Sequence, residues 1–426
     1  MRIEPAAALV GHLVVPGDKY ISHRALRIGA LGEGEMRVGG FGRSGDTQAT
    51  VDAVRALGVE VEDVADDELV VHGVGLRGGL RAGSVDCRNS GTLMRLATGA
   101  LAGQVGEFAL TGDESLTPRP MERVAAPLRR MGATVETTDG HAPVLVTGSG
   151  ALRGIEIEPE VASAQVKSAI LLAGLNAGGP TTVVERIPTR DHTERMLEAA
   201  GARLRRTAAS VTVEPAGALR LAEVSVPGDF SSAAPLLVAA ALVPGSDVTI
   251  HDLGVNPHRT GLLAVLERMG ARVSVFDRRR AGGEPVASVQ VQPGELVATE
   301  IGAGEVPGLV DELPLGALLA SHARGETRVS GAAELRVKET DRIEAVTDGL
   351  RPLGARIHSR PDGWTVTGVP ARLRGGRIDA RGDHRIAMLG AVAGLASREG
   401  VAVEGADTAA ISFPGFYELL ESVTRR

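Results

Sequence analysis

Three lysines stand apart in a chain whose other basic residues are all arginines. Lys19, Lys167 and Lys338 are the lysines among 46 basic residues. A lysine ammonium is a compact charge with three rotatable donors and a pKa that its surroundings can shift, which arginine cannot imitate. The excess of arginine is typical of codon bias, but the retained lysines indicate positions where this chemistry is needed. We expect at least two of the three to be functional.

Basic residues also gather where helices are predicted to begin. The residues concerned are Lys19, Arg24, Arg119, Arg190, Lys338, Arg342 and Arg385. A cation at a helix N-terminus is opposed by the helix dipole, so its repetition indicates that anions fill the space between. The net charge is −7, so local cations must hold these anions. The pattern predicts a pocket for two multiply charged anions.

Hydroxyl residues stand at three predicted helix starts, Ser90–Thr92, Ser163–Gln165 and Ser231–Ser232. The exposed N–H groups of such starts bind anions, although helix capping alone would explain any single one of them. Hydroxyls and cations together favour anion binding.

Carboxylates lie in the same segments. Asp311 and Glu312 open an apolar segment, and Glu339 adjoins Lys338, which we expect one helical turn from Arg342. A carboxylate among cations stays ionised and can act as a general base, whereas a buried carboxyl with a raised pKa can act as an acid. For Glu339 alone, a surface ion pair is an equally good explanation.

Several classes of protein are disfavoured. Aromatic residues make up 2% of the chain, which leaves few platforms for stacking nucleic-acid bases. One cysteine, Cys87, allows no internal disulfide, and the histidines lack metal-site spacing. Neither a secretory leader nor an apolar stretch long enough to span a bilayer is visible. We expect a cytoplasmic monomer without a metal ion, bound nucleic acid or membrane contact.

A helical pattern that closes on a glycine and runs into a strand recurs five times. The closing glycines are Gly58, Gly132, Gly201, Gly270 and Gly354, where the chain needs a left-handed residue. A second set of helices is predicted near Ser22, Ser90, Ser163, Ser231, Glu312 and Asp383. The chain therefore reads as six strand–helix–strand–helix–strand units of an α/β protein. The last unit reaches the chain end, so the N-terminal strand must complete it.

The string Val-Pro-Gly-Asp occurs at residues 15–18 and again at 226–229. Proline–glycine pairs punctuate chains, and here they are expected to mark the two crossings between domains. This predicts one domain over 16–229 and another that joins 1–15 to 230–426. Two adjacent linkers would form a hinge.

At these residues the chain resembles the 3-phosphoshikimate 1-carboxyvinyltransferase (EPSP synthase) family. The blocks that carry the resemblance include VPGDKYISHRALRIGAL (15–31), DCRNSGTLMRL (86–96), SAQVKSAILLAGL (163–175), NPHRTGLLAVLERMGA (256–271) and ELRVKETDRI (334–343). The resemblance covers nearly the whole chain. It implies a two-domain inside-out α/β barrel with the active site in the interdomain cleft, and no cofactor.

The resemblance also implies the site residues. The phosphoenolpyruvate pocket would comprise Lys19, Gly91, Arg119, Gln165, Arg342 and Arg385. The shikimate 3-phosphate side would comprise Lys19, Tyr20, Arg24, Ser163, Ala164, Gln165, Arg190, Asp311 and Lys338. Asp311 and Glu339 would be the acid–base pair, Lys19 would shuttle or stabilise charge, and His384 would assist.

Two residues depart from the family pattern. Tyr20 stands where the resemblance gives serine, and Arg88 where it gives glycine. Either they are tolerated drift, or the chain is a paralogue with another shikimate-type acceptor or an elimination reaction. A transferase acting on UDP-N-acetylglucosamine is disfavoured, because Cys87 lies at a predicted strand end and not in a mobile loop. A non-catalytic phospho-ligand binder would not need an acid–base pair.

Overall fold

The computed structural model describes all residues from 1 to 426, and they divide into two compact units. Unit 1 comprises Met1–Pro16, Pro227–Arg279 and Pro285–Arg426, and unit 2 comprises Gly17–Val226 and Arg280–Glu284. The two main crossings fall at Pro16–Gly17 and Val226–Pro227, inside the two Val-Pro-Gly-Asp strings. The membership of Arg280–Glu284 in unit 2 had no sequence signal.

Each unit contains six α-helices. Those of unit 2 are α1 (Lys19–Ala30), α2 (Gly45–Ala56), α3 (Gly91–Ala102), α4 (Glu122–Arg130), α5 (Ala164–Gly174) and α6 (His192–Ala199). Those of unit 1 are α7 (Phe230–Leu242), α8 (Gly261–Met269), α9 (Leu313–His322), α10 (Arg342–Leu350), α11 (His384–Leu395) and α12 (Phe416–Val423). Unit 1 also has short 3-10 helices η1 (Val306–Gly308), η2 (Ala333–Val337) and η3 (Ala406–Ile411).

The strands form three small sheets in each unit. Those of unit 2 are β3 (Glu33–Gly39), β4 (Glu60–Ala65), β5 (Glu68–Val74), β6 (Gly83–Asp86), β7 (Gly106–Thr111), β8 (Thr134–Thr138), β9 (His141–Gly148), β10 (Glu156–Ile157), β11 (Thr181–Val184), β12 (Leu204–Arg206), β13 (Ser210–Val213) and β14 (Glu223–Ser225). Those of unit 1 are β1 (Arg2–Ile3), β2 (Ala8–Val14), β15 (Asp247–Gly254), β16 (Arg272–Ala281), β17 (Glu284–Gln292), β18 (Glu300–Ile301), β19 (Gly325–Val329), β20 (Arg356–Arg360), β21 (Gly363–Gly368), β22 (Gly376–Asp379), β23 (Val401–Glu404) and β24 (Thr424–Arg425). The last two residues of β16 and the first residue of β17 are counted with unit 2.

All six sheets share one pairing pattern. The strand before the first helix of a repeat pairs in parallel with the strand after it, as β6 does with β7, and that strand then pairs antiparallel with the last strand, as β7 does with β9. In the incomplete last repeat, β1 supplies the antiparallel partner of β23. The predicted six repeats and their completion by the N-terminal strand are confirmed.

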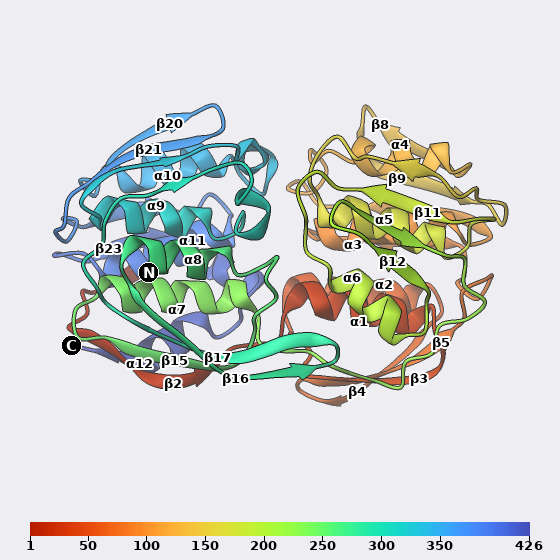
Figure 1. Ribbon diagram of the computed structural model, residues 1–426, viewed down its shortest axis with the longest axis horizontal. Helices are drawn as coiled ribbons and strands as arrows, with labels where there is room; N and C mark the ends of the chain where they lie inside the picture. Colours follow the sequence, from red (N-terminus) through yellow and green to blue (C-terminus); the bar gives the residue numbers. More distant parts are fainter. The chain divides into compact units, whose positions relative to one another are not determined.

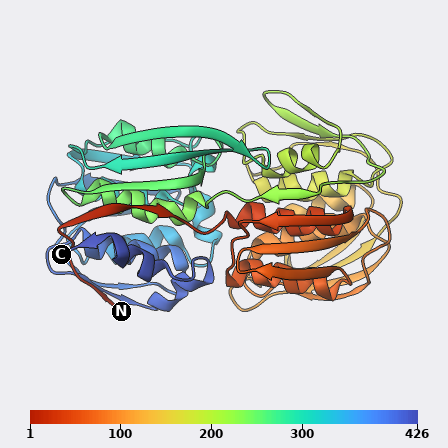
Figure 2. The ribbon, with the colours of Figure 1, turned by 90° about the horizontal axis from the view of Figure 1, so that it is seen from below.

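At each of the two crossings, the strand that precedes the crossing pairs within its own unit and not with the repeat that follows it in the chain. β2 precedes α1 in the chain but pairs in parallel with β15 of unit 1, and β14 precedes α7 but pairs in parallel with β3 of unit 2. Figure 2 shows β2 (red) running beside β15 (green). The strand that precedes α1 in the chain therefore belongs to a sheet of unit 1, and the strand that precedes α7 belongs to a sheet of unit 2.

The core of each unit lies between its helices and sheets. In Figure 1 the sheets of unit 1 that contain β21 and β15 lie on opposite sides of its helices. Every residue of α1, α9 and α11 is buried, so these helices pack on all sides. The chain's one tryptophan, Trp364, is fully buried in unit 1, and its indole N–H donates to the carbonyl of Ile343 at 3.0 Å. No helix is both long and apolar enough to cross a bilayer.

The five predicted closing glycines are all left-handed, with φ between 88° and 103°. The predicted helix start near Ser22 was wrong, whereas the start near Ser231 lies within one residue of the observed one. α1 begins at Lys19 because Asp18 caps it, so Ser22 lies inside this helix, and α7 begins at Phe230 because Asp229 caps it. The helix expected from Lys338 begins at Arg342, because the Asp341 side chain accepts from the N–H groups of Ile343 and Glu344.

Candidate functional site

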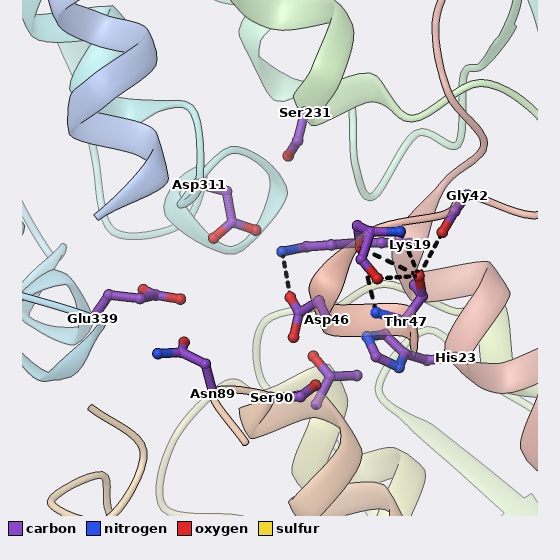
Figure 3. A network of polar contacts seen from close by, with 12 residues as sticks. Lys19, His23, Gly42, Asp46, Thr47, Asn89, Ser90, Ser231, Asp311 and Glu339 are labelled. Atoms are coloured by element: carbon purple, nitrogen blue, oxygen red, sulfur yellow. Dashed lines mark hydrogen bonds and ion pairs between the residues drawn. The ribbon is translucent and has the colours of Figure 1, made fainter. Parts of the chain in front are cut away.

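Lys19, the first residue of α1, forms a buried ion pair with Asp46 in the first turn of α2. The Nζ to Oδ2 distance is 3.0 Å, and little of either side chain is exposed. Figure 3 shows this pair with His23 and Ser90 around it. The loop before α2 is held by Thr47, whose hydroxyl donates to the carbonyl of Gly42 at 2.6 Å. The ammonium of Lys19 is thus fixed in place from two helices.

Burial and charge set the protonation states around Lys19. Burial alone would raise the pKa of Asp46, but Lys19 and His23 lower it to about 2. Burial lowers the pKa of His23 to about 3, so its imidazole is neutral at pH 7, with Nδ1 at 2.7 Å from the hydroxyl of Thr50. Lys19 is therefore paired with a carboxylate and adjoins a neutral imidazole.

Arg24 lies one turn along α1 from Tyr20. Its Nε donates to the Thr193 hydroxyl at 2.7 Å, its Nη2 to the Ser168 hydroxyl at 2.9 Å and its Nη1 to the Tyr20 carbonyl at 2.8 Å. The Tyr20 ring does not turn away from this cluster, because the Arg190 guanidinium lies over it at 4.5 Å. The structure brings these predicted residues together.

The start of α3 holds a second predicted group. A Cβ at Gly91 would lie 2.9 Å from Nη1 of Arg95 and 3.4 Å from Nη1 of Arg119, so both guanidinium groups approach the backbone at this position closely. Arg119 Nη2 donates to the Asn89 side chain at 3.1 Å. The Gln165 carbonyl accepts from Arg95 at 2.7 Å.

Ser163 and Ala164 open helix α5. The Ser163 hydroxyl accepts from the N–H of Val166, which makes Ser163 the N-cap, and Ala164 is the first helical residue. The capping interpretation of this hydroxyl is thus confirmed, and the backbone N–H groups of the first turn remain the feature suited to an anion.

Arg342 is the centre of the predicted residues in unit 1. Its Nε lies 2.8 Å from Asp383, its Nη2 lies 2.7 Å from Glu339, and its Nη1 lies 3.6 Å from Asp311. Burial would lower the pKa of Arg342, but Asp383 and Glu339 raise it above its ordinary value. Glu339 is therefore part of a buried cluster and not of a surface ion pair.

Lys338 lies beside this cluster but not on a helix with Arg342, contrary to the prediction. It follows η2, and three residues separate it from α10. Burial and the Arg342 charge lower the pKa of Lys338, partly offset by Asp311. A lysine with a lowered pKa can exchange a proton more readily than an ordinary one.

Arg385 and His384 open helix α11, which Asp383 caps. The Asp383 carboxylate accepts from the Arg385 N–H at 2.8 Å, and Nη1 of Arg385 donates to the Ser231 carbonyl at 3.4 Å. His384 is buried. The predicted unit 1 residues thus converge around Arg342 and Asp383.

Lys167 differs from the other two lysines. Its Nζ lies 2.7 Å from Glu194 and 2.9 Å from Glu185, and it donates to the Thr189 carbonyl at 3.3 Å. The side chain is buried. These contacts give Lys167 a structural part, which is to hold the segment that carries Arg190.

Sequence reasoning missed the carboxylates that pair with the key cations. Asp46 was not predicted as a site residue, and Asp383 was predicted only as a helix start. Both pairs join residues far apart in sequence, Lys19 with Asp46 and Arg342 with Asp383. The available signal was that both acids lie at the start of a helix, Asp46 in the first turn of α2 and Asp383 as the N-cap of α11.

Nearly the whole chain matches the model of one protein family. The model of EPSP synthase (3-phosphoshikimate 1-carboxyvinyltransferase) matches residues 3–420. The chain belongs to the EPSP synthase family. A 3-phosphoshikimate 1-carboxyvinyltransferase of Alkalilimnicola ehrlichii is 48% identical over 98% of this chain and 94% of its own length. That of Halorhodospira halophila is 49% identical over 98% and 95%.

A solved structure agrees with this family assignment. The EPSP synthase of Acinetobacter baumannii is 42% identical, covers 99% of this chain and 98% of its own, and has a TM-score of 0.87. The predicted fold is therefore confirmed. The comparisons give no support to a paralogue within the EPSP synthase family.

The environment of Cys87 also disfavours a transferase that acts on UDP-N-acetylglucosamine and uses a reactive cysteine. It is fully buried, and burial raises the pKa of its thiol to about 12. A thiol that stays protonated at neutral pH is a poor nucleophile.

Proposed function

We propose that this chain transfers the carboxyvinyl group of phosphoenolpyruvate to the 5-hydroxyl of shikimate 3-phosphate and releases phosphate. The observation that carries the proposal is the membership of the EPSP synthase family over residues 3–420, and the charged residues proposed for the reaction are present in the chain. The chain is thus an enzyme of two anionic substrates, in line with the clustered cations.

The residues of unit 2 are proposed to bind the anionic groups of both substrates. Lys19, Arg119 and the first turn of α3 at Gly91 would hold phosphoenolpyruvate, with Gln165 as a polar contact. Arg24, Arg190 and the α5 start at Ser163–Ala164 would hold shikimate 3-phosphate. Fixed donors stabilise developing charge without reorganising during the reaction.

The residues of unit 1 are proposed to carry the proton transfers. Asp311 and Glu339 form the acid–base pair, held by the Arg342 guanidinium. Arg342 and Arg385 would bind phosphoenolpyruvate, Lys338 would contact the shikimate phosphate side, and His384 would assist.

The proposed reaction is an addition followed by an elimination. The 5-hydroxyl oxygen attacks C2 of phosphoenolpyruvate and loses its proton to a base, while C3 gains a proton and becomes a methyl group. The tetrahedral intermediate then loses a proton from C3 as the bond from C2 to the phosphate oxygen breaks. Phosphate leaves and the double bond is restored, so each step needs both an acid and a base.

Phosphate release, measured with and without phosphoenolpyruvate, tests the proposed reaction. Glu339→Gln and Asp311→Asn should each lower kcat by about 100-fold or more, because general acid–base catalysis contributes that much. The exposed Glu326 provides a matched control, and Glu326→Gln should retain wild-type kcat. Phosphate release from shikimate 3-phosphate alone would contradict transfer and favour elimination.

A further inference from the structure

Tyr20 lies among three cations of unit 2. The Arg190 guanidinium carbon is 4.5 Å from the centre of its ring, and Nζ of Lys19 is 5.5 Å from it. Tyr20 and Arg190 are only 8% and 9% exposed. A cation within about 6 Å of a ring centre is attracted by the negative face of the ring, more strongly when water is excluded.

The like charges around this ring repel one another. The pKa of Arg24 falls to about 10, chiefly through burial, and Arg190 is among the charges that lower it. Arg24 is fixed by the hydroxyls of Thr193 and Ser168. Arg24 and Arg190 are therefore close enough to repel each other, while the carboxylates of Glu194, Asp18 and Glu284 offset part of this positive charge at Arg24.

The backbone on both sides of Arg190 is anchored independently of Tyr20. On one side the Thr189 carbonyl accepts from Lys167 at 3.3 Å, and its N–H donates to Glu185 at 3.2 Å. On the other side, His192 Nδ1 lies 2.8 Å from the carboxylate of Glu284. These contacts hold the backbone around Arg190, and the Tyr20 ring packs against its guanidinium.

We propose that Tyr20 is a positioning residue whose ring holds the Arg190 guanidinium in the orientation that binds shikimate 3-phosphate. The identity of the bound ligand, shikimate 3-phosphate, rests on the proposed function. The contact between the Tyr20 ring and the Arg190 guanidinium does not. Arg190 would touch the substrate, and Tyr20 would act through Arg190. The tyrosine that replaces the family's serine at position 20 therefore has a role next to the cations Lys19 and Arg190.

Replacement of the ring tests this role. Tyr20→Leu, which keeps an apolar side chain without the ring face, should raise the KM for shikimate 3-phosphate by about 3- to 30-fold, the range that a cation–π contact supports. The KM for phosphoenolpyruvate and kcat should change much less. Tyr20→Phe, which keeps the ring, should raise the KM less than Tyr20→Leu. The only other tyrosine, Tyr417 of α12, provides the matched control, and Tyr417→Phe should leave both KM values at wild type.

A double-mutant cycle with Arg190→Gln separates positioning from simple packing. In the Arg190→Gln background, Tyr20→Leu should change the KM for shikimate 3-phosphate hardly at all, because no guanidinium remains to be positioned. An equal effect of Tyr20→Leu in both backgrounds would overturn the inference. So would equal increases in KM for Tyr20→Phe and Tyr20→Leu.

A second measurement keeps the inference independent of the activity. The free energies of unfolding of the same four proteins, from urea titrations, should be non-additive, with Tyr20→Leu costing less when Arg190 is already replaced. Additive values would overturn the stack whether or not the enzyme is active. If the wild type releases no phosphate from phosphoenolpyruvate and shikimate 3-phosphate, the proposed function fails, and the unfolding cycle still decides whether Tyr20 holds Arg190.

Discussion

The helices α1 and α7 begin in the same way and then diverge. Each follows Val-Pro-Gly-Asp, is capped by the aspartate of that string, and is almost entirely buried in its unit. α1 continues with Lys19 and Tyr20 and carries a histidine and two arginines further along. α7 continues with Phe230 and is otherwise built from small and apolar residues and a proline.

This difference shows that the same backbone element can carry either buried charged side chains or only small and apolar ones. In unit 1 the buried cation next to α7 belongs to another segment of the chain. Arg259 pairs with Glu312 at 2.9 Å and lies 3.5 Å from Asp229, the N-cap of α7. In unit 2 the helix itself carries the charge, and Asp46 neutralises Lys19 from α2. A buried ion needs such a partner, so the neighbouring segments of the two helices differ in the charges they carry.

The first residue after each cap offers the largest contrast. Lys19→Met should lower kcat/KM by at least about 100-fold, because it removes a fixed charge that stabilises the reacting anions. Phe230→Met, at the same place in α7, should retain wild-type kcat/KM and lose stability by about 1–2 kcal/mol as its ring is removed. Phosphate release and thermal unfolding measure the two effects. Equal kinetic losses at both positions would break the contrast.

His23 occupies a place where α7 has Ala234, and it should make the stability of the protein depend on pH. Folded His23, with a pKa of about 3, stays neutral, whereas the unfolded chain takes up a proton near pH 6.5. Stability is therefore lost as the pH falls below 6.5, by up to about 1.4 kcal/mol per pH unit. His23→Ala should flatten the decline in free energy of unfolding between pH 6.5 and 5. His358→Ala, at an exposed site, controls for the loss of one histidine.

The two capping aspartates should contribute comparable amounts. Asp18→Ala and Asp229→Ala should each cost about 1–2 kcal/mol, because both side chains accept from N–H groups of the first turn. Asparagine retains the capping oxygen and should recover at least half of the loss at each site. If Asp229→Asn is no more stable than Asp229→Ala in urea titrations, the charge that faces Arg259 matters more than the cap.

Two matching turns should give the smallest effects. Arg88 and Arg381 both have left-handed backbones, with φ of 48° and 51°, and they pair with Asp52 and Asp348. Both ion pairs are exposed and contribute little, whereas glycine suits this backbone better than arginine. Arg88→Gly and Arg381→Gly should therefore each change stability by less than about 1 kcal/mol, towards greater stability. A loss of activity in Arg88→Gly would contradict its interpretation as drift.

Sequence periodicity predicted the repeats well because the features behind it are local. The second helix of each repeat ends at a residue with a left-handed backbone, and glycine supplies it at Gly58, Gly132 and the equivalent positions. Ser90 and Ser163 were correctly placed at helix starts for the same reason, since each side chain caps its own first turn.

The misplaced helix starts have a physical cause. Aspartate and serine cap equally well, so the serine at position 22 does not exclude an earlier start, and Asp18 caps α1 instead. The Ser22 hydroxyl instead accepts from the N–H of Gly42 at 3.0 Å. The ion partners of Lys19 and Arg342 depend on packing between distant segments, which no local pattern encodes.

The single tryptophan gives the molecule a built-in optical probe. Because Trp364 is buried in the core of unit 1, its fluorescence reports the unfolding of unit 1 and does not report that of unit 2. Circular dichroism at 222 nm follows the helices of both. Coincident curves would mean that the two halves melt as one cooperative block, and separated curves would show that each half melts at its own temperature.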